Sequence, residues 1–571
     1  LTGTASVLNT LLTAGNNVTV SNQFSADSFA SLATATVSGN TMSIADLNGA
    51  IAQANTATGK TTSAQGATVF SVSSGATINT GDEAAFTTLL DNETNGLVTL
   101  TDQNLTVDSG TISVDNANLL SATTTGTVTA AITTTERISK LKTLTETTNA
   151  YTIVISSEDS AASASDLNAI NALTTADINL GNVTSITSSS LSDINTLLNA
   201  ISNNETSHDI TIAQFAVNDE TIDMTELAAS IDSYDTLNAT KTAKMTLASG
   251  ATINVDSSEV THMLADETAN RLEISDQKIV VNPAATISVS NANLLDATTT
   301  GTITASIATD STVDSLKTLT GANNYTIVIS SADATGSTAV ELTTIDNATT
   351  VQIDANAITS LTGTYQEIKD LYGSEGVTGL GDENLFVNGD LTVAQANEID
   401  ALTTGTVNGG IDDAETVDSL KTLTGTNAYT ITISAADATG STAAELNTIN
   451  AKTSEAVNIS NLREITNSSI ADIGILGTAI SNNEFSNPSN AVLTSITLSD
   501  SEIDATTLAA TIDDIDTING SSGTTLIKLP SAATINLDSS LEATHMLADE
   551  AAARLIITDQ NIVVNPAVTI S

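Results

Sequence analysis

Hydrophobic residues follow two alternating patterns along the chain. Short β-rich stretches such as Asn17–Asn22, Thr34–Gly39 and Ala67–Val72 alternate with stretches of helical apolar spacing such as Ser43–Ala54 and Gly81–Leu90. Strands that alternate with helices of about ten residues indicate parallel strands joined by helical crossovers. The pattern therefore predicts an α/β fold with parallel pairing.

One phrase of the sequence occurs three times. It runs from Asn291 to Ser330, and closely similar stretches begin at Asn116 and Gln395. Each copy reads as helix, strand, helix, strand. Predicted strands begin 24 to 35 residues apart at Thr127, Tyr151, Asp177, Asp209, Lys244, Leu272 and Thr302, and later ones include a strand near Leu555. Repeats of this length are typical of solenoids, in which each coil contacts only its neighbours. We therefore expect a repeat solenoid of strand–(short strand)–helix coils with a continuous parallel sheet.

The sequence also contains a repeat that is longer than one coil. The sequence HMLADE occurs at His262–Glu267 and again from His545. We divide the chain into N-terminal solenoid coils at 1–101, a long block at 102–275, a short block at 276–381, and a second long block with the start of the next at 382–571. No Gly/Pro/Ser-rich linker separates these blocks, so we expect one continuous solenoid. Neither end shows a polar capping coil, which favours a fragment of a longer array or a subunit whose ends the next copy covers.

Several predicted helices carry start signals. Thr338 with Glu341 and Thr442 with Glu445 form the capping-box pattern, in which each side chain satisfies a backbone N–H at the helix start. Ser311 is the expected cap of a helix that ends before Gly321.

The charge balance excludes some partners. The chain has 66 acidic and 15 basic residues, a formal net charge of -51, and no cysteine. Such a surface repels nucleic acid and anionic lipid, suits high-salt water and attracts divalent cations. No apolar run approaches the roughly 18 residues of a membrane span. We expect no nucleic-acid partner, no membrane insertion and no disulfide or thiolate chemistry.

Candidate catalytic residues are few. The only histidines are His208, His262 and His545, and the last two occupy equivalent repeat positions. No recognised nucleophile, zinc or phosphate-binding motif is present in the sequence. We expect a structural role for the histidines and no enzymatic activity.

Calcium is the metal that the acidic turns favour. Asp256 and Asp538 stand in equivalent turns, and Asp82, Asp382 and Asp390 stand in others. Oxygen-only ligation by carboxylates and carbonyls suits a hard cation. The EF-hand loop and the calcium-binding nonapeptide are both missing, so solvated acidic turns are the alternative interpretation.

The phrases LLDATTTGTITASI, VDSLKTLTG and NYTIVIS resemble repeats in giant secreted cell-surface proteins of bacteria, notably marine cyanobacteria. Those proteins are associated with surface layers, adhesion and swimming. The resemblance implies an extracellular structural role. We expect a secreted or cell-surface structural protein that builds a fibre, surface layer or cell-surface scaffold by self-association. It implies no functional residues. A second copy of the chain is the expected partner, with a cell-envelope glycan as a further candidate.

Two other functions remain open from the sequence. The chain is alternatively the spacer or stalk of a giant adhesin that binds a surface or a glycan. The Thr-rich strands also suit an ice-binding solenoid, although their copies do not form one uninterrupted file, and threonine favours strands on ordinary grounds.

Overall fold

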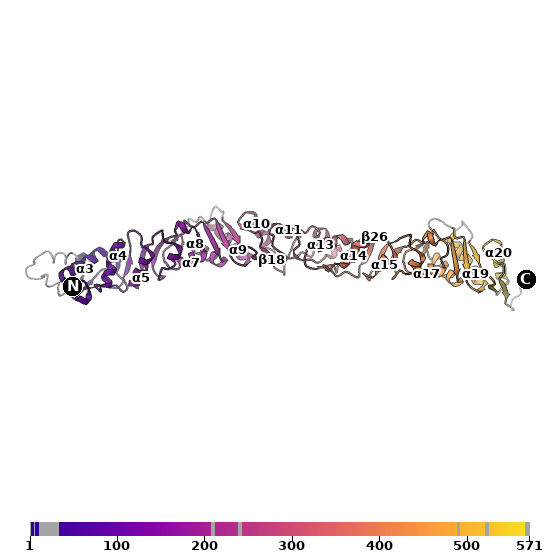
Figure 1. The fold of residues 1–571 in the computed structure, drawn as a ribbon, viewed down its shortest axis with the longest axis horizontal. Helices are drawn as coiled ribbons and strands as arrows, with labels where there is room; N and C mark the ends of the chain where they lie inside the picture. The colour runs from indigo at the N-terminus through magenta and orange to yellow at the C-terminus, as the bar shows by residue number, and fades with distance from the viewer. Residues whose placement is uncertain are drawn as a thin grey trace, which may run out of the picture. The chain divides into compact units, whose positions relative to one another are not determined.

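The computed structural model describes residues 2–4, 6–8, 10, 33–206, 212–237, 243–487, 492–519 and 525–565. The predicted strand at Asn17–Asn22, the predicted strand start at Asp209 and the histidine His208 lie outside these residues. The chain divides into two compact units, Leu1–Ala285 with Leu294–Ile303 and Thr286–Asn293 with Thr304–Ser571 (Figure 1). The block boundaries at 102, 276 and 382 stay predictions from the repeat.

Helices occur throughout both units. Those of the first unit are α3 (Ile44–Thr58), α4 (Glu83–Thr94), α5 (Val114–Thr123), α6 (Ile138–Leu141), α7 (Ala164–Asn171), α8 (Leu191–Ser202), α9 (Met224–Leu237) and α10 (Val260–Thr268). Next in the sequence is α11 (Val289–Thr298). Those of the second unit are α12 (Val313–Leu316), α13 (Ala339–Asp346), α14 (Tyr365–Gly373), α15 (Val393–Asp400), α16 (Val417–Leu420), α17 (Ala443–Asn450), α18 (Ile470–Ser481), α19 (Ala505–Asn519) and α20 (Ser540–Ala551).

The strands of the first unit form separate sheets. One has the order β1 (Thr2–Gly3), β2 (Thr34–Val37), β4 (Val69–Val72) and β6 (Val98–Thr99). A second has β11 (Ile178–Asn179), β9 (Ala150–Val154), β8 (Val128–Ala131), β7 (Asn104–Thr106), β5 (Thr77–Asn79) and β3 (Thr41–Ser43). A third has β10 (Ala161–Ala162), β12 (Ser185–Ser189), β13 (Gln214–Val217), β15 (Lys244–Leu247) and β17 (Leu272–Glu273). A further set is β14 (Thr221–Asp223), β16 (Thr252–Val255) and β18 (Lys278–Val281).

The second unit repeats this arrangement. Its largest sheet has the order β22 (Ser337–Thr338), β24 (Ser360–Thr364), β26 (Asn384–Leu391), β27 (Val407–Ile411) and β28 (Ala428–Thr430). Another has β30 (Glu464–Ser468), β32 (Ser495–Leu498), β34 (Leu526–Lys528) and β36 (Leu555–Ile556), and a third has β33 (Glu502–Asp504), β35 (Thr534–Leu537) and β37 (Asn561–Val564). Smaller groups are β19 (Thr286–Ile287), β20 (Ile303–Ile307) and β21 (Asn324–Thr326), the pair β23 (Ile353–Asp354) and β25 (Val377–Thr378), and the pair β29 (Val457–Asn458) and β31 (Phe485–Ser486).

The predicted α/β class with parallel strands is confirmed, because helices and strands alternate and the strand pairings between coils are parallel, as between β5 and β7. The continuous sheet is not confirmed, since the described strands fall into several separate sheets. The reason lies within the coil. Thr34–Val37 and Thr41–Ser43 are separated by a turn at Gly39, which has a φ of 122°, and the two short strands enter different sheets.

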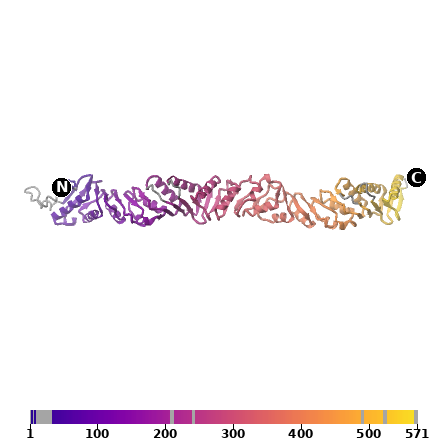
Figure 2. The ribbon, with the colours of Figure 1, turned by 90° about the horizontal axis from the view of Figure 1, so that it is seen from above.

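The core of each unit consists of files of apolar side chains, one from each successive coil. Met42, Ile78, Leu105 and Val128 are in register across four strands, and each is at most 6% exposed. Alternate residues of a strand point to opposite faces, so the polar neighbours point away from the core. In both ribbon views, successive elements of a unit follow one another in chain order, and contacts join neighbouring coils (Figures 1 and 2).

One order of eight elements recurs along the described part of the chain. It reads strand, strand, helix, strand, strand, helix, strand, strand, and it runs, for example, from β2 to β7, from β13 to β18 and from β32 to β37. The first of these lies in the N-terminal solenoid coils that the sequence predicts at 1–101. The alternation of strand pairs with helices therefore includes that part of the chain.

Helix starts follow the sequence closely. Both predicted capping boxes, at Thr338 and Thr442, are formed. The prediction for Ser311 was wrong by one residue, because the Thr312 hydroxyl accepts the Ser315 N–H at 3.3 Å and caps α12. Among the described residues, no helix combines the length and apolar character needed to cross a membrane.

Candidate functional site

One polar arrangement that recurs in the structure is the contact by which one coil docks on the coil before it. The coil that docks consists of a helix, a Thr-Thr-Gly turn and a strand, and we call it the TTG coil. The three turns are Thr124–Gly126, Thr299–Gly301 and Thr403–Gly405. We treat this docking contact as the candidate functional site.

The first threonine of each turn joins two coils. Its hydroxyl donates to a backbone carbonyl of the preceding coil and accepts the N–H of the glycine at 2.9 Å. The donated bonds join Thr124 to Gln103 at 2.6 Å, Thr299 to Gln277 at 2.6 Å and Thr403 to Glu383 at 2.7 Å. The backbone of the second threonine adds a bond, such as Thr125 N–H to Thr101 O at 2.8 Å.

The glycine is required by close approach. A Cβ on Gly126, Gly301 or Gly405 would lie 2.4, 2.3 or 2.3 Å from the carbonyl oxygen that the threonine binds. That distance is well inside van der Waals contact, and the obstacle is backbone, which cannot move aside as a flexible side chain can. Only glycine lets the two coils approach at this turn.

The receiving coil presents what we call the Asp-Gln turn. Its three regular copies are Asp102–Gln103, Asp276–Gln277 and Asp559–Gln560. The Gln277 side-chain oxygen accepts the Ser275 N–H at 2.7 Å, while its Nε2 donates to Ala248 O at 3.0 Å in the coil before. A serine hydroxyl of that earlier coil donates to each aspartate, and this bond lowers the pKa of Asp102, Asp276 and Asp559 below its ordinary value. The turn thus links three successive coils.

A fourth turn, Asp382–Glu383, carries a carboxylate where the others carry an amide. Glu383 is 1% exposed, and its Oε2 accepts the Gly381 N–H at 2.8 Å, as the glutamine oxygen does. Its Oε1 takes the place of the amide nitrogen and has no hydrogen-bond partner. A carboxylate oxygen cannot donate to a carbonyl, so the link to the earlier coil is lost here.

We expect Glu383→Gln to stabilise the fold by about 1 to 2 kcal/mol, because it replaces a buried unsatisfied oxygen with a donor. The matched control is the reverse change, Gln277→Glu, which is expected to destabilise by a similar amount. Urea unfolding of the 571-residue chain measures the change in stability of both variants. Hydrogen exchange, read in β24 and β26 for Glu383→Gln and in β16 and β18 for Gln277→Glu, locates that change. A Glu383→Gln variant less stable than the natural chain would contradict this interpretation.

A second type of coil covers each TTG coil. The largest buried side chain of this coil is a tyrosine. The three copies are Tyr151, Tyr325 and Tyr429, each 0% exposed. Each tyrosine hydroxyl donates at 3.3 Å to a helix carbonyl of the TTG coil, respectively that of Ala117, Ala292 and Ala396. Burial raises the pKa of Tyr151 to about 12, so the hydroxyl stays protonated and remains a donor.

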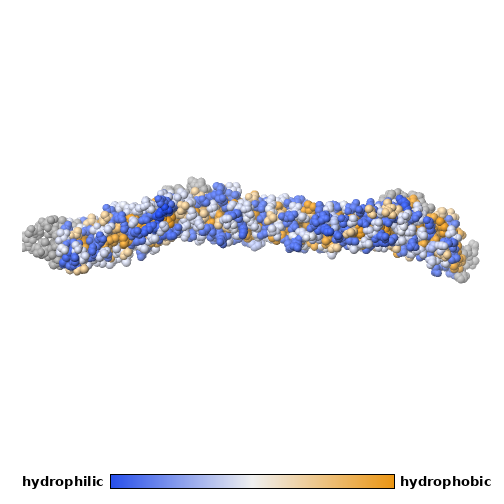
Figure 3. All heavy atoms as spheres, in the orientation of Figure 1, coloured by the Kyte–Doolittle hydropathy of each residue, from blue (hydrophilic) through white to orange (hydrophobic). Residues whose placement is uncertain are grey.

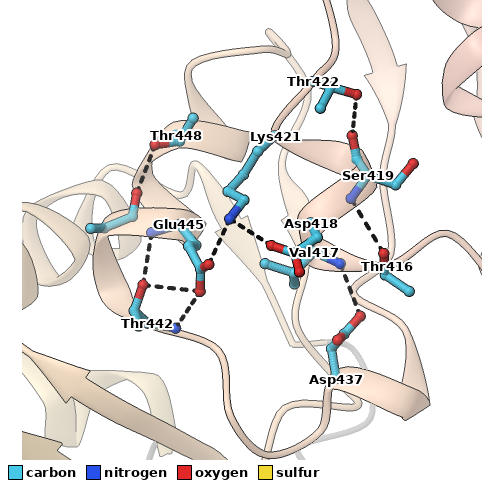
Figure 4. A network of polar contacts seen from close by, with 11 residues as sticks. Thr416, Val417, Asp418, Ser419, Lys421, Thr422, Asp437, Thr442, Glu445 and Thr448 are labelled. Atoms are coloured by element: carbon cyan, nitrogen blue, oxygen red, sulfur yellow. Dashed lines mark hydrogen bonds and ion pairs between the residues drawn. The ribbon is translucent and has the colours of Figure 1, made fainter.

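A lysine joins the helix of the tyrosine coil to the next helix (Figure 4). The Lys421 ammonium lies 2.8 Å from Asp418 and 2.7 Å from Glu445, which also completes the capping box of α17. Lys317 makes the same two contacts, with Asp314 at 2.6 Å and Glu341 at 2.8 Å. The hydrogen bond from the Lys317 ammonium lowers the pKa of Glu341 below its ordinary value. We call this arrangement the lysine clamp.

An arginine cluster joins α9, α10 and the start of β17. The Arg271 guanidinium pairs with Asp266 at 2.8 Å and also with Asp235, whose side chains are 4% and 8% exposed. His262, which the sequence predicted to be structural, lies 3.7 Å from Asp266. Burial raises the pKa of Asp266. The cluster recurs at Arg554, which lies 3.3 Å from Asp549.

Sequence reasoning missed this cluster. A signal was present, because Arg271 and Arg554 stand at the same distance after His262 and His545. The contacts themselves reach across coils to Asp232 and Asp235, which the repeat alone does not reveal.

The five aspartates predicted to bind calcium lie at separate positions. Asp82 caps α4 and accepts the Ala85 N–H at 3.1 Å. Asp382 belongs to the Asp382–Glu383 turn, and Asp390 is an exposed residue of β26. These three side chains are not brought together with one another or with the other two.

Asp256 and Asp538 occupy equivalent turns. Each accepts a bond from an asparagine of the next coil, Asn282 at 2.9 Å and Asn565 at 3.1 Å. Asp256 also lines a cavity of about 290 Å³ with Asp223, Glu259 and Asn282 among others. No group of three or more His, Asp or Glu in the described part of the chain is arranged to hold a metal ion. Calcium binding stays a prediction.

The face of the molecule shown in Figure 3 is mostly hydrophilic, with scattered hydrophobic positions. No protein-family model matches the chain, and no curated protein sequence matches it. The functional proposal therefore rests on the repeated contacts between coils.

Proposed function

We propose that this chain is an α/β solenoid that serves as an extracellular structural protein, building a fibre, surface layer or scaffold by self-association. The observation that carries the proposal is the repeated docking of TTG, tyrosine and Asp-Gln elements. The chain uses recurring polar side chains to hold these coils on their neighbours. Arrays stabilised by nearest-neighbour contacts can be extended without redesign of a central core, which suits a mechanical role.

The charge suggests how assembly is controlled. A formal net charge of -51 keeps separate copies apart at low ionic strength. Salt or divalent cations screen that repulsion and allow surfaces to meet. Exposed apolar residues on the helices, such as Leu119, Leu294 and Ile475, would then contribute to lateral contacts. The cell-surface location and a cell-envelope glycan partner are supported by the resemblance of the repeats to secreted bacterial proteins.

The second candidate is a spacer within a giant adhesin. The same net charge favours it, because mutual repulsion would keep neighbouring copies from associating. In that case another part of the adhesin would bind the ligand, and the coils would serve only to hold that part away from the cell.

Electron microscopy of the purified chain, with calcium present and after chelation, separates the two functions. Ordered fibres or sheets support the structural proposal, and their loss on chelation would assign the cation to the contacts between copies. Separate particles under both conditions would overturn self-assembly by this chain and favour the spacer.

A further inference from the structure

The turn Asp382–Glu383 differs from the three Asp-Gln turns at one buried side-chain atom. Glu383 is 1% exposed, and its Oε1 has no hydrogen-bond partner. Its Oε2 accepts the N–H groups of Gly381 and Asp382 at 2.8 and 3.1 Å. In the Asp276–Gln277 turn, the glutamine oxygen accepts the two equivalent N–H groups at 2.7 and 3.2 Å. The two side chains are therefore oriented alike, and Oε1 of Glu383 stands where Nε2 of Gln277 stands.

In the three glutamine copies, hydrogen-bond acceptors surround this position. The glutamine Nε2 donates to the aspartate of its own turn at 3.0 to 3.1 Å. It also donates to the coil before, at carbonyl distances of 2.9 to 3.2 Å. An amide nitrogen satisfies both kinds of acceptor because it carries two hydrogens. A carboxylate oxygen at the same position, as in Glu383, adds a further acceptor and supplies no donor.

The carbonyl of the earlier coil has a fixed place in the strand register of the glutamine copies. Thr246 is the last residue of β15 that pairs with β17, and the acceptor is Ala248, two residues further on. Lys528 is the last residue of β34 that pairs with β36, and the acceptor is Pro530, again two residues further on. The register therefore identifies the equivalent carbonyl in the coil before Glu383.

This carbonyl belongs to Asn356. Asp354 is the last residue of β23 that pairs with β25, the strand before the Asp382–Glu383 turn, and Asn356 stands two residues further on. The stretch between β25 and the turn is one residue longer than in the glutamine copies. It lies against the earlier coil, because a Cβ on Gly379 would be 2.7 Å from the backbone nitrogen of Asn356. The oxygen donors around this position are thus those of Asp382, Glu383 and the Asn356 backbone.

We propose that Asp382 and Glu383 hold a calcium ion together with the carbonyl oxygen of Asn356. Carboxylate and carbonyl oxygens are the ligands that calcium takes, and it tolerates irregular geometry and completes its shell with water. Asp382 is exposed, so solvent and ions reach the turn. Two carboxylates match the charge of the ion, which would replace the glutamine amide as the link to the earlier coil. The buried oxygen without a partner, rather than the number of carboxylates, carries the proposal.

Hydrogen exchange of the 571-residue chain tests the site, in calcium chloride, in magnesium chloride at the same concentration, and in EDTA. Calcium is expected to slow exchange of the Gly381 and Asp382 amides, which donate to Glu383, at least about tenfold. Magnesium is expected to slow it less than about threefold, because magnesium demands a regular octahedral shell. No slowing by calcium would overturn the proposal. Equal slowing by both salts would assign the effect to screening of the net charge of -51 and would also overturn it.

Two matched variants exchange the side chains of the two kinds of turn. Glu383→Gln is expected to reduce the calcium effect on exchange to less than about twofold. Gln277→Glu is expected to gain a calcium effect at the Ser275 and Asp276 amides, because it recreates the same set of oxygens in another turn. Circular dichroism checks that both variants fold in EDTA, and the Glu383→Gln comparison decides the test if Gln277→Glu does not. An unchanged calcium effect in Glu383→Gln would contradict the assigned ligand.

Calcium also changes the expected stability of Glu383→Gln. In EDTA this variant is expected to be more stable than the natural chain, because the glutamine amide satisfies the acceptors around it. Calcium is expected to remove that advantage, since the ion binds and stabilises only the natural turn. Urea unfolding in calcium and in EDTA measures the difference. An advantage of equal size under both conditions would contradict calcium binding at this turn.

The proposed site lies between two coils of one chain, so it does not rest on self-association. If calcium protects the turn while microscopy shows only separate particles, the site stands and self-assembly is wrong. If fibres or sheets depend on calcium while the turn is not protected, the ion acts between copies and the site at Glu383 is wrong.

Discussion

Replacing Arg271 with leucine is expected to destabilise the coils around α9 and α10 by about 3 to 5 kcal/mol. The arginine side chain is 18% exposed and pairs with Asp235 and Asp266, which are almost fully buried. Its loss leaves two desolvated carboxylates beside each other without a counter-charge. Urea unfolding measures the loss of stability, and hydrogen exchange in α9 and α10 locates it. A deficit below about 1 kcal/mol would contradict the assigned role of the cluster.

The pH dependence gives this prediction a second signature. Burial raises the folded-state pKa of Asp266, and Arg271 opposes that rise. Without Arg271 the folded state therefore takes up a proton at a higher pH than the unfolded chain does. The loss of unfolding free energy in the variant is largest at neutral pH. It becomes smaller as the pH falls through the raised folded-state pKa of Asp266. A matched control replaces Arg271, Asp235 and Asp266 together with leucine, which removes the unpaired charges and restores most of the stability.

Changing Gly126 to alanine is expected to cost on the order of 3 kcal/mol, because the added Cβ would lie 2.4 Å from Gln103 O. The two coils must separate, which weakens the hydrogen bonds from Thr124 to Gln103 O and from Thr125 to Thr101 O. Amide hydrogens at Leu105, Val107 and Thr125 are expected to exchange roughly 100-fold faster. Hydrogen exchange read by mass spectrometry over β7 and β8 checks this.

The control for this change is Gly474→Ala in α18. No heavy atom lies within 4 Å of the Cβ position there, and the residue is inside a helix. The same substitution is expected to be neutral or to stabilise by up to about 1 kcal/mol, because alanine favours helix more than glycine does. Equal effects at the two glycines would show that close approach is not what requires Gly126.

Much of the secondary structure could be predicted from the sequence. Strands expected to begin at Lys244, Leu272 and Leu555 begin there in β15, β17 and β36. In β15 and β17 apolar residues alternate with polar ones, and β36 begins a short apolar run, Leu555–Ile557, both of which are strand signals. The strands β12 and β30 were missed, because each has a single large apolar residue in a stretch rich in serine, threonine or asparagine.

The docking contacts could not be predicted, because they join residues of different coils. In the sequence, Gly126 is typical of an ordinary turn glycine, and nothing local indicates that Gln103 O lies against it. The acidic turns were ambiguous for the same reason. Asp82 suits a metal ligand as well as a helix cap until its bond to the Ala85 N–H is seen. Register between coils is tertiary information that residue spacing does not contain.

The proposed solenoid is tested most directly by the radius of gyration of the purified 571-residue chain in solution, measured by small-angle X-ray scattering under conditions without assembly. A compact protein of this length would have a radius of gyration of about 25 Å. Stacking of coils on nearest neighbours predicts a clearly larger value, with a separate and much smaller cross-sectional radius. A value near that of a compact protein would contradict the solenoid.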